Sequence, residues 1–334
     1  MVYNIVNTLR NPIKREDDGR FLKSWIEPKD LGRGLFKAGN AIDPTASQQR
    51  LDWREKVAFE LGKLINLPVA KTELANFRSS KNQPKIPGTI SFDYTPNNAE
   101  VISLRKFITE ADADYDSSYS NDFDDGYNVV NVIDLFDRHS VGLPHDWKTI
   151  DGINDAADLL VGYLILDTWL GATDRHDENL EIAISSTGYS LCPTFDHGDC
   201  LGSKLTDNEQ NLDNLSNPRL SESCWWEKDV EISTIRALEI AGGIRPDAAA
   251  IWQKQLARIT PKQIAEIFDR IPDDLINPTS AKFAQDLLAY NQQHILSLNL
   301  SQFLAEQPLS NVRVTAFEPI KPKLNSDDDE LSLG

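Results

Sequence analysis

The stretch "TDRHDENLEIAISSTGYSLCPTFDHGD", residues 173–199, decides how the rest of the chain is interpreted. Two clusters of charged residues, at 174–179 and 196–199, flank a segment that alternates like a β-hairpin. The run before it, residues 159–166, is almost entirely apolar and predicts a buried helix. Because burying so many ionisable groups is costly, the two clusters must either be solvated or bind a ligand.

The spacing within this stretch points to one kind of chemistry. Asp174 and Asn179 lie five residues apart on a loop after the buried helix, and Asp196 follows the hairpin. A carboxylate can accept the proton of a hydroxyl, while amide and carboxylate oxygens bind Mg²⁺. Kinases use the same Asp-x-x-x-x-Asn loop, followed by a metal-binding Asp. Either aspartate alone would suggest an ordinary turn, but the two in this order favour phosphoryl transfer.

Residues 1–109 predict a small β-rich lobe. A hairpin is expected at 21–39, a helix at 51–65, and further strands at 69–74, 88–94 and 101–107. Lys37 lies in a strand and Glu55 on the helix that follows, and protein kinases hold a phosphate-binding lysine with such a glutamate. Glu60 lies at the opposite edge of the apolar stripe, so periodicity alone does not choose between the two glutamates.

Residues 110–128 are rich in aspartate and predict an acidic connector between two lobes. Residues 129–306 predict a helical lobe, with helices at 129–138 and 156–169 and a capping box at 260–263. Residues 307–334 end in an acidic run and are expected to be partly disordered. The predicted fold class is α+β: a two-lobed, protein-kinase-like fold with a small β-rich N-lobe containing one helix and a larger, mainly α-helical C-lobe.

The net charge, the cysteine spacing and the absence of long apolar stretches argue against nucleic-acid-binding, membrane-bound and disulfide-rich proteins. The 334 residues carry a formal net charge of −18, which disfavours direct nucleic-acid binding and docking on an anionic membrane. The three cysteines form no C-x-x-C pair, and no stretch of about 18 apolar residues occurs. These features lead us to expect a cytoplasmic protein without a disulfide framework.

Four segments together resemble a known family. They are "DWREKVAFELGKLINLPVAKTELANF" (52–77), "PGTISFDYT" (87–95), "GATDRHDENLEI" (171–182) and "LCPTFDHGDCLG" (191–202). They look like the HipA-like bacterial serine/threonine kinases, which are distantly related to phosphatidylinositol kinases. The resemblance implies an ATP- and Mg²⁺-dependent kinase that transfers the γ-phosphate to a hydroxyl, with a protein as the expected substrate.

The resemblance also assigns roles to individual residues. Lys37 would contact the ATP phosphates and Glu55 would pair with it, while Asn179 and Asp196 would bind Mg²⁺. Asp174 would be the catalytic aspartate. His176 falls on the catalytic loop of the family, where a hydrogen-bonding role is favoured over general-base chemistry.

Other possibilities stay open at the level of sequence. No G-x-G-x-x-G motif exists, and residues 17–20, which could cover the phosphates, are more typical of a plain turn. The acceptor could be a lipid or a small molecule, or the chain could be a catalytically silent pseudokinase that acts as a binding module. A metal-dependent hydrolase using His176 and His197 is a further alternative. A regulatory or antitoxin-like protein partner is compatible with the family resemblance.

Overall fold

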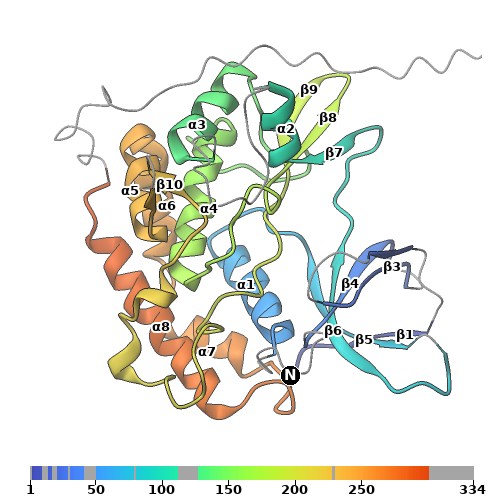
Figure 1. Cartoon of the computed structure of the whole chain (residues 1–334). Coiled ribbons are helices and arrows are strands. Elements are labelled where there is room, and N and C mark those ends of the chain that lie inside the picture. Colours follow the sequence, from blue (N-terminus) through green and yellow to red (C-terminus); the bar gives the residue numbers. More distant parts are fainter. Residues whose placement is uncertain are drawn as a thin grey trace, which may run out of the picture.

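The computed structural model describes residues 2–9, 14–16, 21–28, 31–40, 50–78, 80–111, 127–227 and 230–300. Most strands lie in the N-terminal part of the chain, and most helices lie in the C-terminal part (Figure 1). This division confirms the predicted α+β class with a β-rich N-lobe and a mainly helical C-lobe. Most of the predicted acidic connector and the whole predicted tail lie outside the described residues.

Six strands form the sheet of the N-lobe, in the order β1-β5-β6-β4-β3-β2. β1 and β5 are parallel, and the other neighbours are antiparallel. The hairpin predicted at 21–39 is present, and its turn contains Gly32 with φ 81°, a conformation that glycine adopts at no steric cost. The strands are β1 (Val6–Leu9), β2 (Lys14–Glu16), β3 (Lys23–Ile26), β4 (Gly34–Ala38), β5 (Thr72–Arg78) and β6 (Ile86–Phe92).

Alternation along these strands gives the sheet two chemically different faces. One face buries apolar side chains, among them Phe36, Phe77 and Ile90. The opposite face, here called the inner face, lines a cavity with lysine, hydroxyl and larger apolar side chains. Because successive residues of a strand point to opposite sides, burying Phe36 in the apolar core directs Lys37 toward the cavity.

Helix α1 (Asp52–Leu64) confirms the helix predicted at 51–65 and packs against β5 and β6. On its apolar face Val57, Ala58 and Leu61 are fully buried, whereas Leu64 is only partly buried. The helix ends where Asn66 adopts φ 58° and the amide of Leu67 donates to the carbonyl of Gly62 at 2.9 Å. This packing fixes the first turns of α1, which carry Glu55, beside the sheet.

The chain passes to a second sheet between β6 and β7 (Glu100–Ser103). β7 pairs with β8 (Glu181–Ser185), and β8 pairs with β9 (Gly188–Leu191). Helix α2 (Leu104–Ala111) follows at once, so the strand predicted at 101–107 was wrong from residue 104 onward. Leu104, Phe107 and Ile108 are buried at helical spacing, and this packing outweighs local strand propensity. The lobe division at 110–128 stays a prediction, but strand pairing groups β7 with the C-terminal elements.

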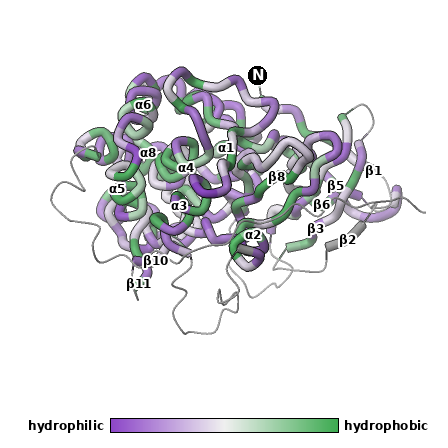
Figure 2. Tube along the Cα trace, turned by 90° about the horizontal axis from the view of Figure 1, so that it is seen from above, coloured by the Kyte–Doolittle hydropathy of each residue, from purple (hydrophilic) through white to green (hydrophobic). Residues whose placement is uncertain are grey.

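Helix α4 (Ala156–Leu170) is the centre of the C-lobe, and every one of its residues is buried. Figure 2 shows it among the helices that pack around it, which are α3 (Val129–Arg138), α5 (Thr234–Ile244), α6 (Pro246–Leu256) and α8 (Pro278–Ser297). The Asp155 side chain caps its N-terminus by accepting a hydrogen bond from the amide of Asp158, and it ends at Gly171 with φ 60°. The polar loop that follows therefore starts from a rigid, buried element.

The remaining elements complete the C-lobe. Helix α7 (Pro261–Phe268) begins with the predicted capping box, in which Thr260 and Gln263 satisfy each other's backbone amides. Two 3₁₀ turns span Leu212–Asn214 and Pro218–Leu220, and β10 (Trp226–Glu227) pairs antiparallel with β11 (Val230–Glu231). Across the described residues, no helix is long and apolar enough to cross a membrane.

Candidate active site

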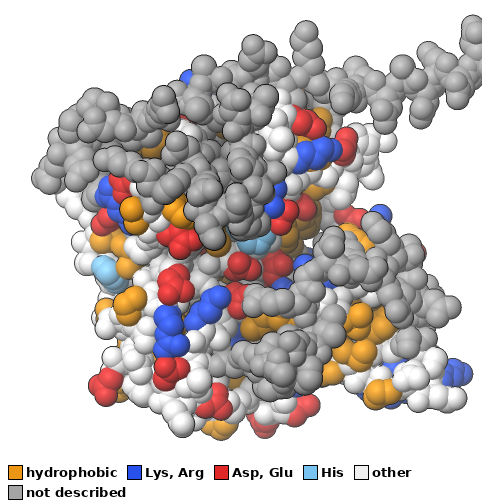
Figure 3. Space-filling view, in the orientation of Figure 1, with side chains coloured by type: hydrophobic (Ala, Val, Ile, Leu, Met, Phe, Trp, Pro, Cys, Tyr) orange, Lys and Arg blue, Asp and Glu red, His pale blue; other side chains and the backbone are white. Residues whose placement is uncertain are grey.

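A cavity of about 750 Å³ lies between the inner face of the N-lobe sheet and the polar loops of the C-lobe. All six residues singled out in the sequence line it: Lys37, Glu55, Asp174, His176, Asn179 and Asp196. The space-filling view shows acidic and basic side chains gathered near the hollow between the two parts of the molecule (Figure 3). Residues separated by up to 159 positions are thus brought to one place.

Lys37 holds two carboxylates from two different elements. Its Nζ lies 3.5 Å from Oε1 of Glu55 on α1, and it contacts Oδ1 of Asp196 on the segment after β9. The other carboxylate oxygen of Glu55 accepts a hydrogen bond from the backbone amide of His197 at 2.9 Å. Glu60, the alternative left open by periodicity, instead pairs with Lys56 at 2.8 Å and Lys63 at 3.0 Å. Long-range packing therefore chooses Glu55 as the partner of Lys37.

The buried charges of this cluster perturb one another. Burial raises the pKa of Glu55 to about 7, although Lys37 acts in the opposite direction. Burial would also raise the pKa of Asp196, but the positive charges of Lys37 and Lys23 hold that pKa well below its usual value. The two carboxylates keep the pKa of Lys37 above its usual value despite burial. These neighbouring positive charges therefore favour the ionised form of Asp196.

The backbone at Asp196 is shaped for close approach to α1. Asp196 has φ 55°, a left-handed conformation in which non-glycine residues are uncommon and aspartate is enriched. A Cβ added at Gly198 would lie 3.2 Å from Oε1 of Glu55 and 3.2 Å from Cβ of Leu51. Glycine at this position lets the segment pass close to the helix, which permits the hydrogen bond between His197 and Glu55.

The loop at 174–179 is closed by its own hydrogen bonds. The amide of Asn179 donates to the carbonyl of His176 at 2.9 Å, and Nδ2 of Asn179 donates to the carbonyl of Asp174 at 2.7 Å. The backbone amide of Glu178 lies 3.2 Å from Nδ1 of His176 and donates to it. The side chains of Asn179 and His176 therefore hold the loop in shape, while the Asp174 carboxylate lines the cavity.

A buried arginine, which the sequence reasoning did not single out, ties this loop to its surroundings. Nε and Nη2 of Arg175 donate to the two carboxylate oxygens of Asp167 on α4 at 2.9 and 2.8 Å. Its Nη1 donates to the carbonyls of Asn179 at 2.8 Å and Phe195 at 3.2 Å. One guanidinium thus connects the central helix, the 174–179 loop and the residue before Asp196.

Asp167→Ala is expected to lower the free energy of unfolding by about 3–5 kcal/mol, because it leaves Arg175 buried without its counter-ion. Asp167 and Arg175 are only 1% and 4% exposed as side chains, so water cannot replace the lost carboxylate. Urea denaturation measures the change. The matched control is Asp286→Ala, which removes a pair to the exposed Lys282 and should cost less than about 1 kcal/mol. Similar losses of unfolding free energy in both variants would show that the buried ion pair of Asp167 with Arg175 stabilises the protein no more than an exposed pair does.

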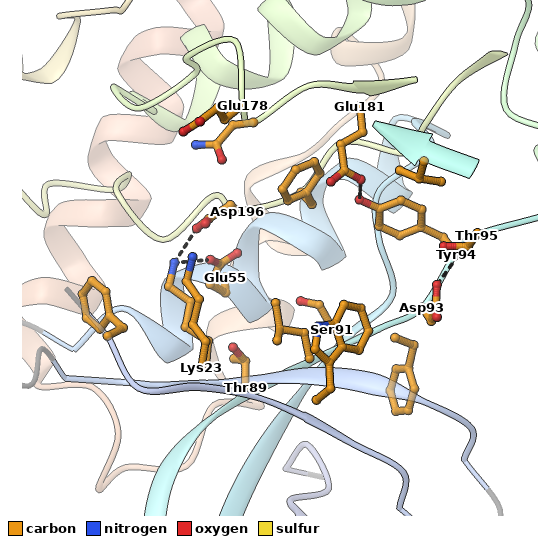
Figure 4. Close-up of a pocket in the computed structure, with 18 of the residues that line it drawn as sticks. Lys23, Glu55, Thr89, Ser91, Asp93, Tyr94, Thr95, Glu178, Glu181 and Asp196 are labelled. Carbon is orange, nitrogen blue, oxygen red and sulfur yellow. Dashed lines mark hydrogen bonds and ion pairs between the residues drawn. The ribbon is translucent and has the colours of Figure 1, made fainter. Parts of the chain in front are cut away.

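The end of the cavity away from Lys37, here called the aromatic end, is lined by aromatic and aliphatic side chains. The side chains at this end are those of Trp25, Leu35, Val101, Tyr94 and Phe195. The hydroxyl of Tyr94, on the segment between β6 and β7, donates to Glu181 of β8 and so fixes the ring at the junction of the two sheets (Figure 4). Such a lining is suited to contact with the flat face of an aromatic ligand group.

The β-rich lobe, the helical lobe and the cavity between them together make up a kinase-like fold. Neither a protein-family model nor a curated protein sequence matches it. Solved structures do. The proinflammatory kinase CtkA of Helicobacter pylori matches with a TM-score of 0.63 and 18% identity over 91% of this chain and 99% of CtkA.

Two further structures match over most of the chain. HipA of Shewanella oneidensis MR-1, solved with HipB and operator DNA, matches with a TM-score of 0.50 and 12% identity, covering 86% of this chain and 68% of HipA. The Golgi casein kinase with Mn and ADP bound has a TM-score of 0.46 and 14% identity, covering 97% and 78% of the two chains. The CtkA and HipA matches confirm the expected resemblance to a HipA-like kinase fold.

Proposed function

We propose that the chain is an ATP- and Mg²⁺-dependent phosphotransferase, and specifically a HipA-like protein serine/threonine kinase. The observation that carries this proposal is the convergence of Lys37, Glu55, Asp196, Asn179 and Asp174 on one cavity. A kinase needs a cation for the nucleotide phosphates, oxygen ligands for metal, and a carboxylate facing the acceptor hydroxyl. Each part has a candidate here, and the kinase-like fold supports the same assignment.

The donor atoms fit Mg²⁺. This ion takes one or two carboxylates together with substrate phosphates and water, so Asp196 and the side-chain oxygen of Asn179 suffice. Because Nδ2 of Asn179 donates to the carbonyl of Asp174, its Oδ1 is turned away from that carbonyl and is available as a ligand. When bound, the metal neutralises charge on the phosphate oxygens. Lys37 would contact the phosphates, and Glu55 would orient it.

Asp174 is the proposed base. Burial raises its pKa above the ordinary value, and the charges of Asp199 and Asp196 raise it further, whereas His176 acts in the opposite direction. The acceptor oxygen would form a bond to the γ-phosphorus as the bond from that phosphorus to the β-γ bridging oxygen breaks. Asp174 would take the hydroxyl proton, and ADP would leave. His176 would position the loop, since its Nδ1 accepts the Glu178 amide.

A metal-dependent hydrolase is less well supported. His197 is buried and its Nε2 lies 3.0 Å from Oγ1 of Thr194. Burial also holds its pKa well below the usual value. The hydrolase alternative leaves the pairing of Lys37 with Glu55 unexplained, whereas phosphoryl transfer uses it.

A protein partner is part of the proposal. The matched HipA structure contains HipB and operator DNA. By analogy, an antitoxin-like or other regulatory protein is the partner class to seek, and a protein is the proposed acceptor. The net charge of −18 disfavours direct contact with nucleic acid or with an anionic membrane surface. We further propose that the protein acts in the cytoplasm.

The test follows label from γ-labelled ATP into a cell extract incubated with the purified protein and Mg²⁺. Protein, lipid and small-molecule fractions are counted separately, and the Asp174→Asn variant provides the background. The proposal expects label on serine or threonine of a protein, absent with the variant. Label confined to the lipid or small-molecule fraction would replace the protein-kinase assignment. Tight Mg·ATP binding without any transfer would indicate a pseudokinase.

A further inference from the structure

A second lysine lies beside Lys37 on the inner face of the sheet. In the antiparallel pair of β3 and β4, Lys23 is directly opposite Lys37. Directly opposite residues project to the same side of a sheet, with Cβ atoms roughly 4.5–5.5 Å apart. Both lysines line the cavity, and Figure 4 shows Lys23 pointing toward Glu55 and Asp196.

Position along β3 separates Lys23 from the aromatic end of the cavity. Lys23 and Trp25 alternate on the cavity side, while Ser24 and Ile26 between and after them are buried on the other side. Trp25 lies beneath the guanidinium of Arg33, at 4.2 Å, and opposite Leu35. Lys23 comes two residues before Trp25 on the same strand, directly opposite Lys37. The strand therefore offers an aromatic surface at one end and a cation at the other.

Two lysines opposite each other repel, and the nearby carboxylates offset part of this repulsion. Asp196 and Glu55 already engage Lys37. The positive charge of Lys23 also acts on Asp196, where it favours the ionised carboxylate. A triphosphate carries more negative charge than one Mg²⁺ and one lysine can balance. An additional cation at this position would therefore be favourable when a nucleotide is bound.

The sequence supplies a further reason. Protein kinases cover the phosphates with a glycine-rich loop whose backbone amides contact the oxygens, and this chain has no G-x-G-x-x-G motif. We infer that Lys23 is a second phosphate-binding lysine, which contacts the β- and γ-phosphates of ATP from the inner face of the sheet. This inference rests on the proposed nucleotide-dependent function and adds a residue to it.

Calorimetric titration of the full-length protein with Mg·ATP, Mg·ADP and adenosine tests the inference. Lys23→Gln should weaken Mg·ATP binding about tenfold or more, which corresponds to about 1.4 kcal/mol. Binding of adenosine should stay within about twofold, because adenosine has no phosphate and the aromatic end of the cavity is unchanged. Lys23→Arg should restore most of the affinity, since the positive charge is kept. Lys85→Gln, an exposed lysine beside β6, makes the same change in net charge and should bind like wild type.

The outcomes separate this inference from the proposed function. If wild type binds no Mg·ATP, the proposed function fails and the role of Lys23 fails with it. If wild type binds Mg·ATP and Lys23→Gln binds it equally well, only the role of Lys23 is overturned. An equal loss for ATP and adenosine would also overturn it, because that pattern indicates disturbed packing. The melting temperature of Lys23→Gln without ligand should stay close to that of wild type, because the lost repulsion from Lys37 and the lost attraction to Asp196 oppose each other.

Discussion

Asp196→Asn is expected to lower the rate of phosphoryl transfer by roughly 10²- to 10³-fold, the size of effect seen when a single charge-stabilising group is removed from an active site. The Asp196 carboxylate is the anionic ligand proposed for Mg²⁺, and it also contacts Lys37. Asparagine keeps the size of the side chain and tolerates the φ of 55° at this position, so the fold should be retained. The loss should therefore reflect chemistry and metal binding.

The initial rate of label transfer at several Mg²⁺ concentrations measures this effect. The variant should need more Mg²⁺ than wild type as well as being slower at saturation. Asp93→Asn is the matched control, because Asp93 lines the same cavity at the end where its carboxylate lies 3.7 Å from Nε of Arg33. It should stay within about threefold of wild type, since interactions away from developing charge contribute little to the rate. Equal losses in the two variants would contradict the metal-ligand role.

Asp174→Asn is expected to lower the maximal rate by roughly 10²- to 10⁴-fold, the range for loss of a general base. Nucleotide affinity should change little, because the proposed contact of Asp174 is with the acceptor hydroxyl. His176→Gln should cost much less, since the histidine side chain supports the loop through the Glu178 amide. Steady-state kinetics of both variants at saturating Mg·ATP provide the comparison. A larger loss for His176→Gln than for Asp174→Asn would reverse the assignment of the base.

The pH dependence of Asp174 has a definite sign. A base acts only when it is deprotonated, and burial raises the pKa of Asp174 above its ordinary value of 3.8. The apparent second-order rate constant should therefore rise with pH through that raised pKa and fall away below it. The same limb should be missing from the residual activity of Asp174→Asn. A wild-type profile that falls only near pH 3.8 or below would contradict a raised pKa at this carboxylate.

Local sequence patterns predicted the elements well. The helix at 129–138 coincides with α3, and the capping box at 260–263 begins α7. Such patterns depend on residues within one or two turns of each other, which the sequence displays directly. The error at 104–107 arose because Leu104, Phe107 and Ile108 pack at helical spacing while the segment also has strand propensity. Tertiary contacts decided between two locally acceptable structures.

The sequence indicated six of the residues that line the cavity, but it did not indicate the residues that hold them in place. Spacing and order within 173–199 indicated Asp174, Asn179 and Asp196 as one site. Three further features depend on long-range packing. These are the pairing of Lys37 with Glu55 rather than Glu60, the ion pair of Arg175 with Asp167, and the position of Lys23 opposite Lys37. Pairing register and burial are not visible in a local window. Residues 17–20, considered for covering the phosphates, lie outside the described residues.

The most direct test is a single-turnover measurement with the purified protein in excess over γ-labelled ATP. The acceptor is the protein that takes up label in the extract experiment, added here in unlabelled form, and the reaction is followed with and without Mg²⁺. Wild type should consume ATP and transfer its γ-phosphate only with Mg²⁺, and Asp196→Asn should do so at least 100-fold more slowly. The central claim would be contradicted if wild type neither bound nor consumed Mg·ATP, or if Asp196→Asn transferred phosphate as fast as wild type.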